Sequence, residues 1–165
     1  MEPSPTHAIV PGSFDPITKG HLDVIERASR IFDRVTVAVS KNAEKTSMFT
    51  ADERLAFAKA AVGHLPNVDA VFAEGLLSDT MERSGALTIV KGARGSVDFD
   101  YEYSLSGVMR TFAPGCDTVI FPAKAELSHI SSTYARELIR YGCPLDRALP
   151  DAVIPLVEKA TAGKV

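Results

Sequence analysis

Short apolar runs alternate with amphipathic segments along most of this chain. The apolar runs are bounded by turn residues, which predicts buried strands; they occupy residues 8–10, 34–40, 68–72, 87–90 and 118–121. The segments between them repeat apolar residues at helical spacing, which predicts helices beginning near Lys19, Thr50, Gly75, Asp98, Ser131 and Pro150. Because strands that alternate with helices form a parallel sheet covered on both faces, we expect an α/β, doubly wound, Rossmann-like domain.

The whole chain, residues 1–165, is expected to be a single domain. It contains no internal repeat and no linker-like stretch, and a chain of 165 residues can bury roughly two thirds of its unfolded surface. Residues 1–6 are predicted to be a flexible leader before the first strand. Pro155 is expected to kink or split the last helix. The helix over 98–112 is predicted to carry one apolar face, made of Tyr101, Leu105, Val108 and Phe112.

The stretch from Val10 to His21, V-P-G-S-F-D-P-I-T-K-G-H, joins the first strand to the first helix through a tight turn. The free N–H groups and the positive dipole end at a helix start form a site for phosphate. Ser13 and Thr18 add hydroxyls, and His21 can present a ring N–H to a phosphoryl oxygen. Neither G-x-x-x-x-G-K-[ST] nor G-x-G-x-x-G follows the strand, so the two commonest phosphate motifs are excluded.

Three further polar segments follow strands two, four and five. Residues 42–49 form a loop that contains Lys45, with Lys41 as an alternative cation, and residues 91–102 read K-G-A-R-G-S-V-D-F-D-Y-E. Residues 127–133 end in three adjacent hydroxyls at a predicted helix start, an arrangement suited to polyphosphate. The carboxyl ends of parallel strands meet at one edge of the sheet, where ligands bind at the reversal of strand order. The sequence therefore predicts one site for a phosphate-bearing ligand at this edge.

Charge and composition exclude several other classes of function. The formal net charge is −3 and no apolar run reaches membrane-spanning length, so we expect neither nucleic acid nor a membrane as a partner. Cys116 and Cys143 are too few to form a metal cluster, and they need no oxidising compartment. The first residues lack the basic and apolar regions of a signal peptide, and we expect a cytoplasmic protein.

The string G-S-F-D-P followed by T-K-G-H resembles the nucleotidyltransferase superfamily that carries H-x-G-H or T-x-G-H after its first strand. Thr18 in place of the first histidine, together with K-G-A-R…D-F-D-Y-E, resembles the phosphopantetheine adenylyltransferase family. The resemblance implies strand order 3-2-1-4-5 and transfer of the adenylyl group of ATP to 4′-phosphopantetheine, giving dephospho-coenzyme A and pyrophosphate. Two departures are Lys91, where many members carry arginine, and Ala93, where a larger aliphatic residue is usual.

The resemblance also implies a role for each matching residue. His21, Lys45 and Arg94 would be catalytic, and phosphopantetheine would contact Ser13, Lys45, Leu77 and Lys91. ATP would contact Ser13, Phe14, His21, Gly92, Ala93, Arg94, Glu102, Leu127, Ser128, His129, Ile130, Ser131, Ser132 and Thr133. Mg²⁺ would arrive on the ATP phosphates, without ligands from protein side chains. The family further implies a homohexamer and feedback inhibition by coenzyme A.

Two alternatives stay open at this point. One is another nucleotidyltransferase of the superfamily, either a mononucleotide adenylyltransferase or a glycerol-phosphate cytidylyltransferase; these usually carry histidine at the position of Thr18. The other is a non-catalytic ATP-binding module, which would not need His21, Lys45 and Arg94 together. Release of pyrophosphate from ATP and phosphopantetheine separates all three.

Overall fold

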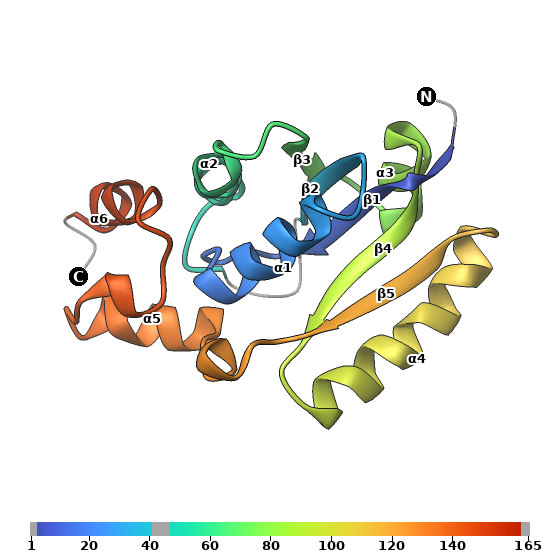
Figure 1. Cartoon of the computed structure of the whole chain (residues 1–165). Coiled ribbons are helices and arrows are strands. Elements are labelled where there is room, and N and C mark those ends of the chain that lie inside the picture. Colours follow the sequence, from blue (N-terminus) through green and yellow to red (C-terminus); the bar gives the residue numbers. More distant parts are fainter. Residues whose placement is uncertain (1–2, 41–46, 163–165) are drawn as a thin grey trace.

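The computed structural model describes residues 3–40 and 47–162. Within them, five parallel strands form one sheet in the order β3-β2-β1-β4-β5, which confirms the predicted fold class and topology (Figure 1). The strands are β1 (Ser4–Gly12), β2 (Arg34–Ser40), β3 (Val68–Ala73), β4 (Ala86–Ala93) and β5 (Asp117–Pro122). The strand order reverses between β1 and β4, so the sheet opens a crevice where these two strands end.

β1 begins earlier than the apolar run predicted. The backbone N–H of Ser4 donates to the Gly85 carbonyl over 2.9 Å, and Ser4 pairs with Ala86 of β4 before the register shifts ahead of Ala8. The prediction of a flexible leader is therefore wrong for residues 4–6. Backbone pairing extends the strand into polar sequence because the hydrogen bonds of a sheet need no apolar side chain.

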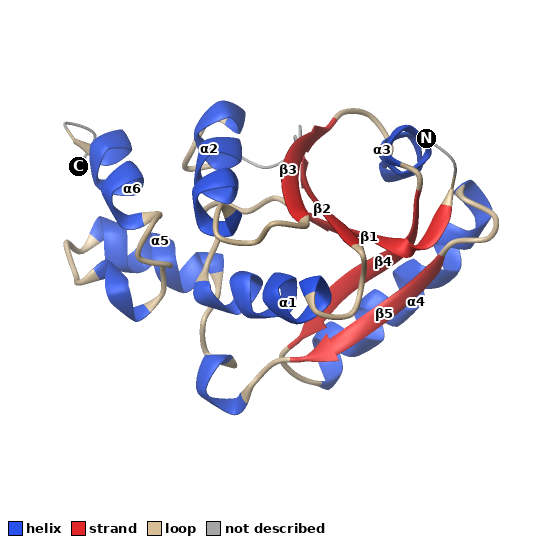
Figure 2. Cartoon of the chain, turned by 45° about the horizontal axis from the view of Figure 1, so that its top comes forward, coloured by secondary structure: helices blue, strands red, loops and turns tan. Residues whose placement is uncertain are grey.

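Helices cover both faces of the sheet, as expected of a doubly wound fold (Figure 2). They are α1 (Lys19–Ser29), α2 (Ala51–Val62), α3 (Leu77–Ser84), α4 (Ser96–Phe112), α5 (Ser132–Arg140) and α6 (Ile154–Thr161). Successive residues of β1 serve different faces: Ala8 and Val10 belong to the core shared with α1, α2, α5 and α6, whereas Ile9 packs in the smaller core with Met81 of α3 and Met109 of α4. No helix in the described ranges is both long and apolar enough to cross a membrane.

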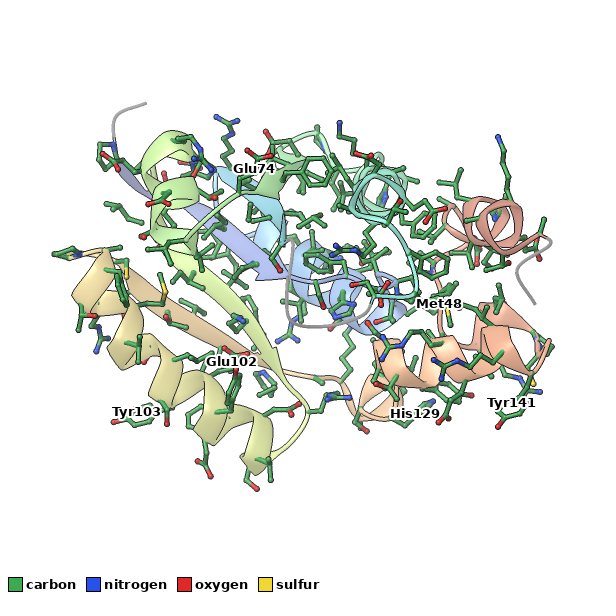
Figure 3. All side chains as sticks on the ribbon, turned by 180° about the vertical axis from the view of Figure 1, so that it is seen from behind. Met48, Glu74, Glu102, Tyr103, His129 and Tyr141 are labelled. Carbon is green, nitrogen blue, oxygen red and sulfur yellow. The ribbon has the colours of Figure 1, made fainter. Side chains whose placement is uncertain are left out.

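α4 lies along β4 and β5 without burying any residue completely. The face predicted from its periodicity contains Tyr101 and Phe112, which are 63% and 56% exposed. Tyr103 projects from the outer side of the same helix (Figure 3). The amphipathic pattern therefore located the helix correctly, but its apolar side chains are largely outside the core of a single chain.

The helix starts follow their sequence signals. Thr50 and Glu53 form the reciprocal cap of α2 that their spacing indicates: the Glu53 N–H donates to Thr50 Oγ1, and the Thr50 N–H donates to Glu53 Oε2. Pro155 neither kinks nor splits a helix, contrary to the prediction, because it lies in the first turn of α6. A proline is well tolerated there, since the first N–H groups of a helix have no carbonyl partner within it.

Candidate active site

A cavity of about 580 Å³ opens at the carboxyl ends of β1 and β4. It lies at the reversal of strand order, where an open α/β sheet binds its ligands. The predicted site residues on its wall are Ser13, Phe14, His21, Lys91, Gly92, Arg94, Glu102, Leu127, Ile130, Ser131, Ser132 and Thr133. The topology thus brings together all four motif segments, the segment of residues 42–49 through Ser47; Lys41 and Lys45 lie outside the described residues.

The loop of residues 12–18, which the sequence predicts to bind phosphate and which is called the phosphate loop below, is held from behind by side chains of other segments. Its carbonyl groups accept hydrogen bonds at four positions: Gly12 from Ser40 Oγ, Ser13 from Arg54, Asp15 from Arg136 and Pro16 from Ser132 Oγ. The donors come from the end of β2, from α2 and from α5. The shape of the loop is therefore set by the tertiary structure and not by local turn chemistry alone.

Phe14 has an unusual conformation in this loop. Its φ of 48° lies in the left-handed region, which is uncommon for a residue other than glycine. Its ring is buried over Gly12, where an added Cβ would lie only 2.9 Å from the Phe14 ring, and it meets the His21 ring edge-on with centroids 5.1 Å apart. Glycine is required at position 12 because any larger residue would displace the Phe14 ring.

The Asp15 carboxylate joins the phosphate loop to the segment that leads into α2. Its two oxygens accept the backbone N–H groups of Met48 and Phe49 over 2.9 and 3.0 Å. Arg136 also approaches this carboxylate, with Nη1 3.7 Å from Oδ2. Asp15 is thus fully engaged in structure, although it lines the cavity.

His21 is held in one tautomer at the start of α1. Its Nδ1 accepts the backbone N–H of Thr18 over 3.0 Å, so the proton of a neutral imidazole lies on Nε2. Burial, together with the nearby charges of Arg94 and Lys91, lowers the pKa of His21 to about 4. At neutral pH, His21 is therefore an uncharged N–H donor on the cavity wall.

Two ion pairs flank the cavity on the side of β4 and α4. Lys91 Nζ lies 3.1 Å from Glu102 Oε1, and Arg94 Nε lies 3.0 Å from Asp98 Oδ2. Partial burial raises the pKa of Asp98, but the hydrogen bonds from the side chain and backbone of Arg94 outweigh it and leave the pKa below its ordinary value. Glu102, predicted to hold the nucleotide, lies on the cavity wall and projects from α4, where it pairs with Lys91 of the neighbouring strand (Figure 3).

The three hydroxyls at the start of α5 have partners within the chain. Ser131 Oγ accepts the Tyr134 N–H over 3.0 Å and caps the helix, Ser132 Oγ donates to the Pro16 carbonyl, and Thr133 Oγ1 accepts from Arg136. The hydroxyls therefore help to assemble the site, while the helix start still faces the cavity.

Three described residues that were predicted to contact ATP do not line this cavity. Ala93 is buried in β4, Ser128 Oγ donates to the Ala125 carbonyl, and the exposed His129 packs against Tyr134 with ring centroids 6.1 Å apart. His129 lies at the outer edge of the molecule, beside the start of α5 (Figure 3).

A second cavity of about 210 Å³ adjoins the first beneath α3 and α4. Gly12, Lys91 and Glu102 belong to the walls of both cavities. The rest of its wall is largely apolar and includes Leu77, which was predicted to contact substrate, as well as Ile89, Leu105, Val108 and Met109. The site thus combines a chamber that contains His21, Arg94 and Asp98, called the polar chamber below, with a largely apolar one, and Lys91 stands at their junction.

Asp15, Asp98 and Arg136 line the cavity, and sequence reasoning assigned them no role. Asp15 lies in the turn of the first motif and Asp98 in the string that begins at Lys91, whereas Arg136 lies three residues beyond the fourth segment. Their position in the sequence was the available signal. Each is a charged residue in or next to a motif segment, where a turn or a helix cap alone requires no charge.

The comparisons with known proteins agree with this geometry. A profile described as cytidylyltransferase-like matches residues 9–138. The chain is 43% identical to a phosphopantetheine adenylyltransferase of Levilactobacillus brevis, over 90% of this chain and 92% of the relative. It is 44% identical to one of Symbiobacterium thermophilum, over 87% and 88%, and 41% identical to one of Limosilactobacillus reuteri, over 92% and 88%. With similarity of this extent, which spans both the phosphate loop and the start of α5, the chain belongs to the phosphopantetheine adenylyltransferase family.

Proposed function

We propose that this chain transfers the adenylyl group of ATP to 4′-phosphopantetheine, releasing pyrophosphate and forming dephospho-coenzyme A. The observation that carries this proposal is the junction of the two cavities at Lys91. An acceptor with a terminal phosphate and a long uncharged arm needs a cation beside an apolar channel. The polar chamber on the other side of Lys91 offers His21 and Arg94 to a nucleotide polyphosphate.

The two substrates fit the site from opposite sides. The phosphate of phosphopantetheine would lie near Lys91 and Ser13, with its arm in the second cavity along Leu77. ATP would occupy the polar chamber, with its phosphates between Arg94 and the start of α5. Both terminal nitrogens of Arg94 lack a hydrogen-bond partner among the described residues, which suits bidentate contact with phosphate oxygens.

The chemistry requires positioning and charge stabilisation rather than a covalent intermediate. The acceptor phosphate is already an anion at neutral pH, so its attack on the α-phosphorus needs little help from a general base. His21 would donate Nε2–H to an oxygen of the α-phosphate as negative charge shifts, and Arg94 would stabilise the departing pyrophosphate. Lys45 lies outside the described residues, and its catalytic role is proposed from the family resemblance alone.

We propose Mg²⁺ as a companion of ATP. The carboxylates on the cavity wall are engaged: Asp15 by two backbone N–H groups, Asp98 by Arg94 and Glu102 by Lys91. No cluster of three or more metal-ligating side chains occurs in the part of the chain that the structure describes. These residues fit an ion that keeps phosphate oxygens and water as its ligands, and its charge would offset that of the triphosphate.

Three further features are proposed on the strength of the family resemblance. We expect the chain to assemble as a homohexamer, to be inhibited by coenzyme A and to work in the cytoplasm. The exposed apolar side chains of α4 support assembly, because large contiguous apolar patches commonly mark protein interfaces. Coenzyme A contains the same pantetheine arm as the proposed acceptor, so it could enter the second cavity.

Pyrophosphate release tests the proposed function directly. The chain should release pyrophosphate from ATP in the presence of Mg²⁺ only when 4′-phosphopantetheine is added. Release with ATP and nicotinamide mononucleotide, or with CTP and glycerol phosphate, would instead identify another activity of the superfamily. ATP binding without turnover of any acceptor would favour a non-catalytic module.

A further inference from the structure

Arg54 is a buried cation directly behind the phosphate loop. It extends from α2, is 4% exposed, and donates through Nη1 to the carbonyl groups of Ser13 and Ser40. No described carboxylate forms an ion pair with it, and its Nε is buried without a hydrogen-bond partner in the described ranges. Burying an unpaired guanidinium costs free energy that an apolar side chain of similar length would not. Packing alone therefore does not account for this residue.

Arg54 and Ser40, whose carbonyl Arg54 also holds, together determine which way two backbone amides of the loop point. In a trans peptide the C=O and the following N–H point in opposite directions. Arg54 holds the Ser13 carbonyl, and Ser40 Oγ holds the Gly12 carbonyl over 3.1 Å, so the N–H groups of Phe14 and Ser13 are turned away from these donors. Ser13 and Phe14 both line the main cavity, whereas Arg54 stands behind them.

The two amides are available to a ligand. Among the described residues, the N–H groups of Ser13 and Phe14 donate to no side chain and to no carbonyl of a turn or loop. Adjacent backbone N–H groups that point into one concavity form an anion site. The positive charge of Arg54, separated from the cavity only by this loop, increases the attraction of the same region for phosphate.

Arg54 also supports the strained conformation of Phe14. A residue other than glycine with positive φ persists only where its surroundings hold it in place. Arg54 holds the peptide group immediately before Phe14, and the Phe14 ring packs against His21. Loss of the hydrogen bond from Arg54 would allow the loop to relax, and the Phe14 ring that packs against His21 would move with it.

We propose that Arg54 is a positioning residue for adenylyl transfer: from behind the loop it orients the N–H of Phe14 directly, and that of Ser13 through Ser40, toward a phosphate of the substrate. It does not touch substrate itself. This inference rests on the proposed function, since it assigns these amides to the phosphates that react.

Variants at position 54 separate positioning from simple stability. R54M keeps the length of the side chain but removes the charge and the donors; we expect kcat to fall about 100-fold, the loss typical of a small misplacement at a reacting centre, with a smaller change in KM. R54K keeps the charge and one nitrogen that can donate to both carbonyl groups, as Nη1 does, and should recover most of the lost kcat. R27M is the matched control, because Arg27 donates to the Pro122 carbonyl at the end of another strand, over 2.8 Å, without contacting the loop. A folded R54M with near-normal kcat, or an equal loss in R27M, would overturn the inference.

Backbone amide NMR gives a readout that a merely structural role would not change. Adding ATP with Mg²⁺ to the unmodified chain should shift the amide resonances of Ser13 and Phe14, and the shifts should shrink in folded R54M. If R54M does not fold, the unmodified chain still decides the matter, since unshifted amides would contradict the inference. This titration needs no turnover, so it remains decisive even if the chain releases no pyrophosphate and the proposed function fails.

Discussion

The backbone N–H of Thr18 donates to Nδ1 of His21 over 3.0 Å, and the backbone N–H of His21 lies 3.4 Å from Thr18 Oγ1. This reciprocal cap of α1 has a chemical consequence as well as a structural one. A ring nitrogen that accepts a hydrogen bond cannot carry the proton, so the cap leaves the donor on Nε2. The same two residues therefore start the helix and prepare the donor that faces the phosphates.

Replacing His21 with alanine should impair turnover far more than substrate binding. A preorganised donor that acts mainly in the transition state contributes about 10²–10³ to kcat. We expect H21A to lose that factor while KM for ATP stays nearly unchanged. H64A is the control, since His64 is exposed and pairs with Glu26 on the surface. Steady-state pyrophosphate release measures both constants; near-normal kcat with a raised KM would show that His21 only binds ground-state substrate.

The lowered pKa of His21 predicts a defined pH dependence. With a pKa of about 4, His21 stays neutral above pH 5, so its protonation should not reduce kcat between pH 6 and 8. In the unfolded chain the same histidine titrates near 6.5. The unfolded state therefore binds more protons between these values, and the free energy of unfolding should fall as the pH drops from 6.5 toward 4. Burial lowers the pKa of His7 as well, and it acts in the same direction.

NMR titration of the imidazole resonances tests the charge state, and urea denaturation at pH 7 and pH 5 tests the stability. H21A and H64A assign the resonances of His21 and His64, since each variant lacks the resonance of its own histidine. A His21 resonance that titrates near 6.5 would contradict the neutral donor and the proposed role of its cap.

The fold was predictable because its determinants are local. Apolar runs bounded by turn residues located all five strands, and the spacing of Thr50 and Glu53 alone indicated where α2 begins. One error, at Pro155, came from misplacing the start of α6, and the other occurred where pairing is non-local. Ser4 belongs to β1 because its N–H donates to the carbonyl of Gly85, and no pattern within residues 1–6 indicates that partner.

The site was predictable in its location but not in its internal contacts. The motifs predicted that the chain segments around His21, Arg94 and Ser131 would share one cavity, and they do. The pairing of Glu102 with Lys91 and the bond from Ser132 Oγ to the Pro16 carbonyl depend on distances between segments far apart in the sequence. Residue type alone cannot distinguish a hydroxyl that binds ligand from one that holds a loop.

Assembly of the chain can be measured independently of catalysis. Tyr103 is 68% exposed and Phe112 56% exposed on α4, and apolar groups of this size gain free energy when a second copy covers them. We expect sedimentation velocity at micromolar concentration to show a species near six chain masses, and Y103K to weaken it. A chain that stays monomeric at high concentration would remove the hexamer from the proposal and leave the chemistry unaffected.

Arg94 should contribute more to the binding of ATP than to the binding of phosphopantetheine. Asp98 holds Nε of its guanidinium and directs the rest of the group toward the polar chamber. R94A should therefore weaken ATP binding strongly and phosphopantetheine binding only slightly, since water cannot replace a bidentate contact. R110A is the control, because it breaks a similar pair with Asp117 on the exposed surface. Titration calorimetry with each ligand alone measures the two affinities. Equal losses of affinity for ATP and for phosphopantetheine would show that Arg94 does not contact ATP.

Lys91 should show the opposite preference, because it stands where the polar and apolar cavities meet. K91M removes the cation but keeps most of the side-chain length, so phosphopantetheine should bind more weakly while ATP binding changes little. E102Q tests the same ion pair by removing its negative charge instead of its positive one. The ion pair at 3.1 Å offsets part of the charge of Lys91 in the free protein, and neutralising Glu102 should leave phosphopantetheine binding intact or make it tighter. Calorimetry on both variants decides the point: if E102Q weakened phosphopantetheine binding as much as K91M, the pair itself, and not the cation, would be what the acceptor requires.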